Sequence, residues 1–284
     1  MTKLRKMSTT WCAGALLAPV LLCHAAQADE RTTACAGAAA TSAAGPTATE
    51  ILQVNYESGT LDSGVPGLTT THATAPDASA VVRPGDDSSY AVQHKVTLDD
   101  PGYVSDGAPR SESATDQLKN GQFNVGDVQR YEFSVLLKDW QPYTAGDSET
   151  GDIVFQGKYG DAQPPAFYLM TKRNAIAFRS PQMDRQSTVV PDFRPYVDQW
   201  MNFRVDADWT TDDTGYFRVS VQLPGQCDYV PEAAWEDIRT YQPAKPTDHG
   251  YLKWGLYRPS ESIANGDVPT RIVEHDDIRV FDLS

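Results

Sequence analysis

The chain has 284 residues, with 38 acidic against 24 basic side chains and a formal net charge of −14 at pH 7. This charge disfavours nonspecific binding to nucleic acid or to an anionic membrane, because both surfaces would repel the protein. No segment approaches the roughly 20 apolar residues that a membrane-spanning helix needs. We therefore expect neither nucleic acid nor a membrane as a partner, and a polyanionic ligand would need a local patch of basic residues.

The N-terminus has the features of a secretory signal peptide. Basic residues precede a largely apolar stretch over residues 11–22. Ala26-Gln-Ala28 then provides the small-x-small pattern at which signal peptidase cleaves. We therefore predict that residues 1–28 are removed and that the mature protein is secreted to the extracellular space.

Residues 29–50 are rich in Ala, Thr, Ser and Gly without apolar periodicity, which predicts a poorly ordered arm. Cys35 lies in this arm, and Cys227 is the other cysteine outside the signal segment. An even pair of cysteines in an oxidising compartment favours one disulfide, Cys35–Cys227, over the alternative of two free thiols.

Residues 51–284 have the pattern of one domain built from short β-type runs, separated by clusters of Gly, Pro, Asp and Asn. The runs are 90–98, 129–137, 152–159, 166–172, 175–179, 200–209, 215–223, 251–257 and 271–281. The helical candidate is the short stretch 231–240. Many short strands with turn signals between them predict an all-β fold, a single-domain β-jelly roll made of two antiparallel sheets in a concanavalin-like sandwich.

Alternation along three predicted strands gathers polar side chains on one face of a sheet. The residues on this face are Arg110, Glu112, Val154, Gln156, Lys158, Tyr251, Lys253, Gly255 and Tyr257. Apolar residues that suit the core alternate with them, among them Ile153 and Phe155. The concave sheet of a jelly roll would bring the polar side chains together.

Such a face can bind and cleave a polymer of uronic acids. β-Elimination removes the proton at C5, next to the carboxylate, and expels the oxygen at C4. A cation or hydrogen-bond donor on the carboxylate stabilises the enolate-like transition state, and a tyrosine can serve as base and acid. The candidate neutralisers are Arg110, Gln156, Lys158 and Lys253, and the candidate acid and base is Tyr257. A lectin groove would use the same residue types.

Seven short motifs follow one another along the chain. They are Arg110-Ser-Glu112, Gln129-Arg-Tyr-Glu-Phe-Ser134, Ile153-Val-Phe-Gln156, Gln199-Trp200, Gly215-Tyr-Phe-Arg-Val219, Tyr251-Leu-Lys-Trp-Gly-Leu-Tyr-Arg258 and His275-Asp-Asp-Ile-Arg-Val280. Together they resemble the jelly-roll polysaccharide lyases of the heparin lyase I and glucuronan lyase type, over roughly residues 51–284. The most specific motif is Tyr-x-Lys-x-Gly-x-Tyr-Arg, of which alginate lyases of similar fold carry a related version.

The resemblance implies roles for the matching residues. Arg110 matches the arginine of the family's Arg-x-Glu strand, and Gln156 matches the glutamine of its Gln-x-His strand. Lys253 and Tyr257 match the lysine and tyrosine of the last motif. The candidate substrate-binding residues in the same motifs are Tyr251, Arg258 and Glu112.

The sequence departs from the family pattern at Lys158, which stands where many relatives have a histidine base. A protonated lysine is a poor base at neutral pH. Either Tyr257 acts as both base and acid, or another histidine takes the role of base. The best substitute is His94, on a predicted strand upstream of Arg110.

Folds of this type often hold a structural calcium between the first and last strands. Glu57 and Asp276 or Asp277 would be the carboxylate ligands, since calcium prefers oxygen ligands from several segments. The alternative is a solvated strand end that binds no metal.

The combined prediction is a secreted, monomeric polysaccharide lyase that cleaves a (1→4)-linked uronate polymer by β-elimination. Glucuronan is the first expected substrate, ahead of heparin-like chains and alginate. The alternative is a non-catalytic carbohydrate-binding protein on the same fold, which the missing histidine leaves open. A glycoside hydrolase would need two carboxylates facing each other across the cleft. The sequence has no Glu-x-Asp-x-x-Glu type run on one strand that would supply them.

Overall fold

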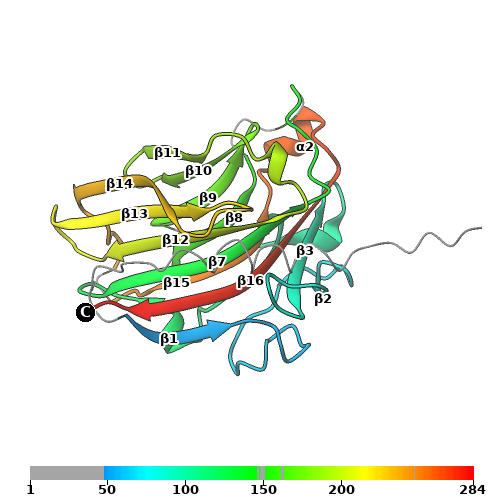
Figure 1. The fold of residues 1–284 in the computed structure, drawn as a ribbon. Helices are drawn as coiled ribbons and strands as arrows, with labels where there is room; N and C mark the ends of the chain where they lie inside the picture. Colours follow the sequence, from blue (N-terminus) through cyan, green and yellow to red (C-terminus); the bar gives the residue numbers. More distant parts are fainter. Residues whose placement is uncertain (1–47, 146, 148–150, 161–162, 246) are drawn as a thin grey trace, which may run out of the picture. The chain divides into compact units, whose positions relative to one another are not determined.

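The computed structural model describes residues 48–145, 147, 151–160, 163–245 and 247–284 (Figure 1). These residues form two antiparallel sheets. We call them the β16 sheet and the β15 sheet, after a long strand in each. The predicted signal peptide, most of the predicted arm and Cys35 lie outside the described residues, so the secretion signal and the Cys35–Cys227 disulfide stay predictions.

Each sheet has eight strands within the described part of the chain. The β16 sheet has the order β14 (Val230–Ile238), β13 (Gly215–Gln222), β12 (Trp200–Asp208), β7 (Val128–Lys138), β16 (Thr270–Asp282), β3 (Ala91–Thr97) and β2 (Ser79–Val82), with β1 (Thr49–Val54) also paired to β16. The β15 sheet has the order β11 (Arg185–Val190), β10 (Ala175–Ser180), β9 (Phe167–Lys172), β8 (Ile153–Tyr159), β15 (Gly250–Tyr257), β5 (Ala108–Ala114) and β4 (Val104–Ser105), with β6 (Gln122–Phe123) also paired to β15.

In the part of the chain that the structure describes, helical structure is confined to short connecting turns. These are the 3-10 turns Pro101–Tyr103, Lys119–Gly121 and Arg194–Tyr196 and the single-turn helix α2 (Glu261–Asn265). Within the described residues, no helix is long and apolar enough to cross a membrane.

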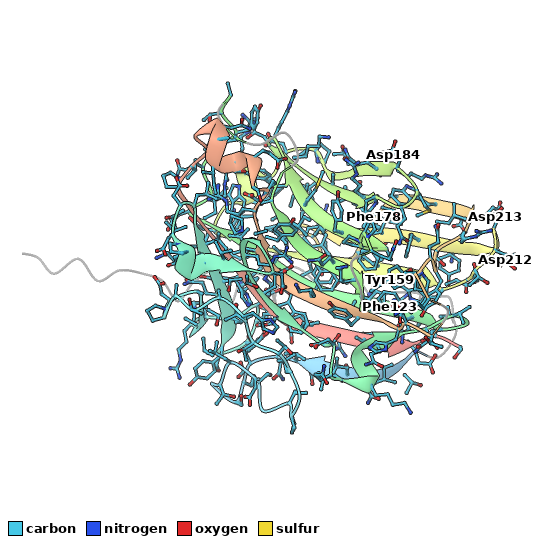
Figure 2. The ribbon with its side chains drawn as sticks, turned by 180° about the vertical axis from the view of Figure 1, so that it is seen from behind. Phe123, Tyr159, Phe178, Asp184, Asp212 and Asp213 are labelled. Atoms are coloured by element: carbon cyan, nitrogen blue, oxygen red, sulfur yellow. The ribbon has the colours of Figure 1, made fainter. Side chains whose placement is uncertain are left out.

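Aromatic side chains from both sheets fill the space between them. Phe133 of β7 stacks on Phe155 of β8, with ring centroids 3.7 Å apart. Phe123 of β6 stacks on Trp209, just beyond β12, at 3.9 Å, and Figure 2 shows Phe123 beside Tyr159 in this interior. Burying each such side chain contributes roughly 1.5–3 kcal/mol. The core therefore holds the two sheets face to face.

All nine predicted β runs form strands, and the two-sheet antiparallel sandwich confirms the predicted fold class. The domain starts slightly earlier than predicted, because Thr49 and Glu50 pair with the end of β16 as part of β1.

The helix predicted over residues 231–240 is wrong, because this stretch lies mostly in strand β14. Ala233, Ala234 and Glu236 have high helix propensity, but antiparallel pairing with β13 overrides it. Trp235 packs into the core at 2% exposure. Pro231 is tolerated because β14 is an edge strand, where a missing N–H donor costs little.

A bulge in β8 corrects the predicted faces of its first residues. The register against β9 shifts between Ile153 and Phe155, so two successive residues, Val154 and Phe155, both join the core. Ile153 packs instead against Tyr168 and Met170 in a separate apolar cluster. Gln156 then keeps the outward direction that alternation predicts.

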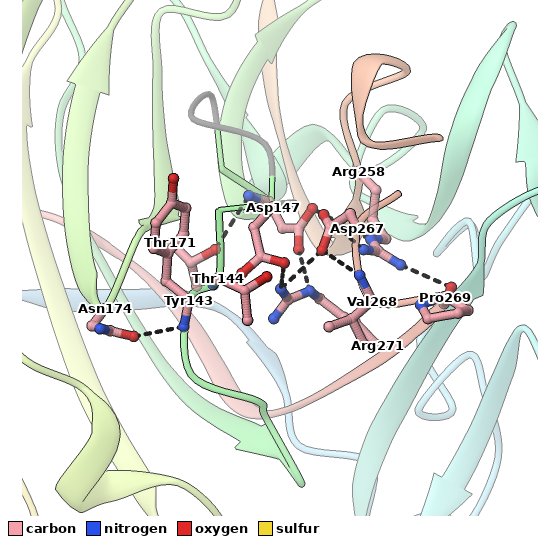
Figure 3. Close-up of polar contacts among 11 residues, drawn as sticks. Tyr143, Thr144, Asp147, Thr171, Asn174, Arg258, Asp267, Val268, Pro269 and Arg271 are labelled. Carbon is pink, nitrogen blue, oxygen red and sulfur yellow. Dashed lines mark hydrogen bonds and ion pairs between the residues drawn. The ribbon is translucent and has the colours of Figure 1, made fainter. Parts of the chain in front are cut away.

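A buried ion-pair cluster joins the ends of β8 and β15 (Figure 3). Arg258, with no exposed side-chain surface, lies 3.4 Å from Asp152 and 3.0 Å from Asp267. Arg271 lies 3.1 Å from Asp152 and also contacts Asp267 and Asp147. Burial raises the pKa of Asp152, and the two arginines oppose that rise. Because Asp152 precedes β8 and Arg258 follows β15, the cluster fixes these two strand ends relative to each other.

Two histidines are buried between the sheets. His94 of β3 and His275 of β16 have no exposed surface, and their ring centroids are 6.2 Å apart. His94 Nε2 lies 3.2 Å from the Ser113 hydroxyl, on the inner side of β5. Burial lowers the pKa of His94 to about 4 and holds that of His275 well below its usual value. Both rings are therefore neutral parts of the core at neutral pH.

The ion-pair cluster predicts a large effect on stability when one arginine is removed. Arg258→Leu leaves the carboxylates of Asp152 and Asp267 buried with less compensation, so we expect the free energy of unfolding to fall by about 3–5 kcal/mol. Arg218→Leu is the matched control, because Arg218 pairs with Glu236 on an exposed surface and should cost below about 1 kcal/mol. Urea unfolding measures both, and equal losses would contradict the assigned role of the cluster.

The buried histidines predict a loss of stability in acid. Because the folded-state pKa of His94 lies below its ordinary value of 6.5, its contribution is complete above pH 6.5 and is lost as the pH falls toward 4. The loss should be on the order of 3 kcal/mol. Unfolding free energies for His94→Gln should fall less steeply over this pH range than those of the wild type, and parallel curves would refute the prediction.

Candidate functional site

The strand β15 divides its side chains between the core and the outer face of the β15 sheet. Leu252, Trp254 and Leu256 have no exposed surface and belong to the core. Lys253 and Tyr257 alternate with them and point outward, as predicted.

Strand register brings the predicted residues of three strands together on this outer face. Tyr257 pairs with Arg110 of β5, and Lys253 pairs with Gln156 of β8. Gly255 pairs with Glu112 of β5. Directly opposed residues on neighbouring strands have their Cβ atoms about 4.5–5.5 Å apart, so these side chains can contact one another.

Gly255 is required for this register. Its φ of 141° is a conformation that other residues rarely adopt. A Cβ at this position would lie 2.3 Å from the carbonyl oxygen of Ser111 and 2.7 Å from the Cα of Glu112. The glycine of the Tyr-x-Lys-x-Gly-x-Tyr motif thus lets β5 approach β15 closely enough to place Glu112 between Lys253 and Arg110.

Glu112 is the centre of the cluster on the outer face. Its carboxylate lies 2.6 Å from the ammonium of Lys253 and accepts a 2.5 Å hydrogen bond from Gln156 Nε2. Arg110 Nη1 lies further away, at 3.9 Å. The Glu112 side chain is 3% exposed, so these partners, and not water, compensate its carboxylate. Lys253 and Gln156 are therefore engaged within the protein, whereas Arg110 is less tightly held.

Arg110 and Tyr257 form the outward part of the cluster. The guanidinium of Arg110 lies over the Tyr257 ring, 4.1 Å from its centroid, in the geometry of a cation–π contact. Arg110 also lies 3.7 Å from Asp106, an exposed residue. Its Nε is buried without a hydrogen-bond acceptor in the described part of the chain. A guanidinium that lies over the ring of a neighbouring tyrosine suits a carboxylate ligand next to an acid or base.

Lys158 and Tyr251 lie on the same face, one cross-strand pair away from the cluster centre. They oppose each other between β8 and β15. The ammonium of Lys158 donates a 2.5 Å hydrogen bond to the carbonyl oxygen of Gln163. Burial, together with Asp116 and Glu112, raises the pKa of Tyr251 to about 12. Lys158 is thus tethered to the β8–β9 connection, and Tyr251 carries a proton at neutral pH.

Two predicted site residues do not join this cluster. His94, the predicted substitute base, lies between the sheets behind Ser113, on the opposite side of β5 from Glu112. The predicted substrate-binding Arg258 lies in the buried ion-pair cluster and also donates to the carbonyl of Pro269. In both cases burial removes the side chain from any ligand on the outer face.

The predicted calcium ligands lie at the other sheet, where hydrogen-bond donors contact two of them. Glu57 accepts from the backbone N–H groups of Ser89 and Tyr90. Asp276 accepts from Ser88 Oγ at 2.5 Å and from a backbone N–H, and burial raises its pKa to about 7. Burial also raises the pKa of Asp277. The described residues contain no group of three or more His, Cys, Asp or Glu side chains arranged to hold a metal ion. Calcium binding stays a prediction, and no step below depends on it.

The outer face carries polar residues beyond β8 that were not among the predicted site residues. Tyr168 of β9 opposes Gln156, and Arg179 of β10 opposes Tyr168. Period-two alternation would have found both, since each is flanked by core residues such as Phe167 and Phe178. Another overlooked residue is His72, exposed in the segment that pairs with β5 through Thr69; no strand pattern marks that segment.

Solved structures with this fold come from several protein classes. The endo-β-1,4-glucuronan lyase of the fungus Trichoderma reesei matches with a TM-score of 0.55 at 18% identity, over 82% of this chain and 95% of its own. The marine PL-14 alginate lyase of Aplysia kurodai matches with a TM-score of 0.55 at 12% identity, over 82% and 98%. The binding domain of Paraclostridial Mosquitocidal Protein 1 matches with a TM-score of 0.52 at 9% identity, over 83% and 49%. At such identities the likeness shows the fold alone.

The sequence itself gives the family. Among curated proteins, none matches the chain. The family model described as polysaccharide lyase matches residues 56–279. This range includes every strand of the β15 sheet. It also includes the β16 sheet except for β1 and the last three residues of β16. Because this match covers far more than half of the sequence, the chain belongs to the polysaccharide lyase family and is a polysaccharide lyase with a jelly-roll fold.

Proposed function

We propose that the outer-face cluster of β5, β8 and β15 cleaves a (1→4)-linked uronate polymer by β-elimination, with glucuronan as the first substrate. The observation that carries this proposal is the Arg110–Tyr257 contact, in which a guanidinium with an unsatisfied buried donor lies 4.1 Å from a tyrosine ring. The guanidinium can neutralise the uronate carboxylate while the phenol faces the adjacent ring carbons. Residues 1–28 support the further proposal that the enzyme is secreted.

The proposed reaction involves one uronate residue, the glycosidic bond at its C4 and the acid and base that transfer the protons. The base removes the proton from C5, and the C5–H electron pair forms the C4–C5 double bond. The C4–O bond breaks, and its electron pair stays on the leaving oxygen, which takes a proton from the acid. Arg110 holds the carboxylate as negative charge develops on it. Lys253 and Gln156 fix Glu112 beside Arg110 and thereby hold Arg110 in place.

Tyr257 is the residue that we assign to both proton transfers. His94 is buried between the sheets, and the ammonium of Lys158 is bound to a carbonyl oxygen. One hydroxyl can take the C5 proton and return a proton to the C4 oxygen only if both lie on the same face of the ring. In D-glucuronate and D-mannuronate they do, whereas in L-guluronate and L-iduronate they lie on opposite faces. This stereochemistry favours glucuronan and mannuronate-rich alginate over guluronate-rich alginate.

The substrate assignment is tested with a panel of uronate polymers. Glucuronan, mannuronate-rich and guluronate-rich alginate, hyaluronan and heparin are incubated with the protein, with and without calcium, while the ultraviolet absorbance of the unsaturated product is followed. We expect the fastest rise with glucuronan and a slower one with mannuronate-rich alginate. No rise with any uronate would refute the proposal, and new reducing ends without absorbance would indicate hydrolysis.

Removing the Tyr257 hydroxyl tests its role. Tyr257→Phe should lower kcat by about 100-fold to 10,000-fold, because proton transfer by a positioned side chain contributes this much, while polymer binding persists. Tyr216→Phe, on the other sheet, is the matched control and should keep full activity. Full activity in Tyr257→Phe would assign proton transfer to another residue.

Arg110 and Lys253 should respond differently to substitution. Arg110→Gln should lower kcat/KM by about 10-fold to 100-fold, because a charge-assisted hydrogen bond to the substrate is lost, with unfolding free energy nearly unchanged. Lys253→Met leaves the buried Glu112 without its nearest cation and should cost about 3–5 kcal/mol of stability. Kinetics and urea unfolding on both variants distinguish the two roles, and the reverse pattern would make Lys253 the carboxylate neutraliser.

A further inference from the structure

A row of polar side chains crosses the β15 sheet at right angles to its strands. Strand register aligns Lys253 of β15 with Gln156 of β8, and Gln156 with Tyr168 of β9. Tyr168 is aligned with Arg179 of β10, and Arg179 with Gln186 of β11. The row thus begins in the proposed catalytic cluster and continues to the far edge of the sheet.

Alternation places Tyr168 and Arg179 on the outer face, as it does Lys253. Phe178, next to Arg179, packs in the core 5.0 Å from Trp235 and 5.3 Å from Phe167 (Figure 2). Phe167 is the core neighbour of Tyr168 in the same way. Successive strand residues point to opposite faces, so Tyr168 and Arg179 project outward.

Among the described residues, Arg179 lacks a strong partner. Its Nε is buried and has no hydrogen-bond acceptor among the described residues. Its Nη2 lies 3.4 Å from Asp184, whose side chain is 94% exposed at the turn between β10 and β11 (Figure 2). An exposed ion pair contributes little, whereas a buried N–H without an acceptor is destabilising. The Arg179 side chain is 29% exposed, so an anion can reach its guanidinium from the solvent side.

The spacing along the row separates Arg179 from the cleavage point. Three strand intervals lie between β15 and β10, and neighbouring strands are about 4.8 Å apart, so Arg179 lies about 14 Å from Lys253. This distance is longer than one sugar ring. Tyr168, only 7% exposed, lies between them; burial raises the pKa of its hydroxyl, and the charge of Arg179 opposes that rise.

We propose that Arg179 and Tyr168 form a second binding subsite, which holds the carboxylate of a uronate residue further along the same polymer. Arg179 would bind that carboxylate through the exposed part of its guanidinium, and Tyr168 would contact the intervening sugar. The polymer therefore runs across the strands from β5 toward β11. This inference rests on the proposed function, since it takes the same uronate polymer as ligand.

The subsite is tested with Arg179→Ala and the matched control Arg218→Ala, which removes an exposed arginine from the other sheet. With long glucuronan, we expect Arg179→Ala to raise KM by about 10-fold to 100-fold, the effect of one lost charge-assisted contact, while kcat changes little. With the shortest oligomer that is cleaved, Arg179→Ala and wild type should behave alike, because that oligomer does not reach β10. Equal KM for Arg179→Ala and Arg218→Ala on the long polymer would overturn the subsite.

Direct binding separates this inference from the proposed function. Calorimetry measures the affinity of wild type, Arg179→Ala and Arg218→Ala for glucuronan and for glucuronan whose carboxylates have been reduced to alcohols. We expect Arg179→Ala to weaken binding to the acidic polymer alone. If Arg179→Ala weakens binding to the acidic polymer alone but no ultraviolet absorbance develops with the wild type, the proposed function is refuted and the subsite is supported. If cleavage occurs and Arg179→Ala binds the acidic polymer as the wild type does, the proposed function stands and the subsite fails.

Discussion

The buried carboxylate of Glu112 is the constraint on which the rest of the outer-face cluster depends. With 3% of its side chain exposed, it cannot be hydrated as a free ion and must be compensated by the protein. Lys253 supplies that compensation from β15, the neighbour of β5, and Gln156 supplies it from β8, the next strand of the sheet. Their engagement leaves Arg110 as the basic group of the cluster that is held least, and therefore as the one best able to exchange its internal contact for a substrate carboxylate.

Gly255 connects this electrostatic arrangement to the backbone. A side chain there would collide with β5, so the close pairing that sets Glu112 between Lys253 and Arg110 requires glycine. Tyr257 and Arg258, which follow in the same motif, point to different sides. Tyr257 lies on the outer face, and Arg258 lies in the buried ion-pair cluster with Asp152 and Asp267. That cluster holds the end of β15 against the start of β8, which limits the movement available to the Tyr257 backbone and favours a preorganised site.

Period-two alternation and turn residues were enough to predict the strands, the two-sheet sandwich and the outward direction of Lys253, Tyr257 and Gln156. These features depend on local pattern, which a sequence displays directly. Alternation failed at Ile153, because a bulge adds one residue on one strand and its position depends on the partner strand. It also could not reveal that Arg258 and His94 are buried, since charged and polar residues are normally exposed and their burial depends on partners distant in sequence. Which cation contacts Glu112 likewise depends on register between strands, as does the alignment of Arg179 with the cluster.

The protein is negatively charged overall but carries basic side chains on the outer face of the β15 sheet, and this contrast limits which polymers it can bind. A protein with a formal net charge of −14 repels a polyanion at long range, so binding must come from contacts made after close approach, where a few well-placed cations act at short distance. Within the outer-face cluster, Arg110 and Lys253 together outweigh Glu112 by one positive charge, Lys158 lies on the same face, and Arg179, 3.4 Å from Asp184, lies further along the row. A few basic side chains, each partly compensated by a nearby carboxylate, suit a polymer with one carboxylate per sugar residue better than a densely sulfated chain, whose additional charges would find no partner. Salt should therefore affect binding in two opposed ways, since screening weakens both the general repulsion and the local attraction, and the net salt dependence should be shallower than for a protein whose whole surface is basic.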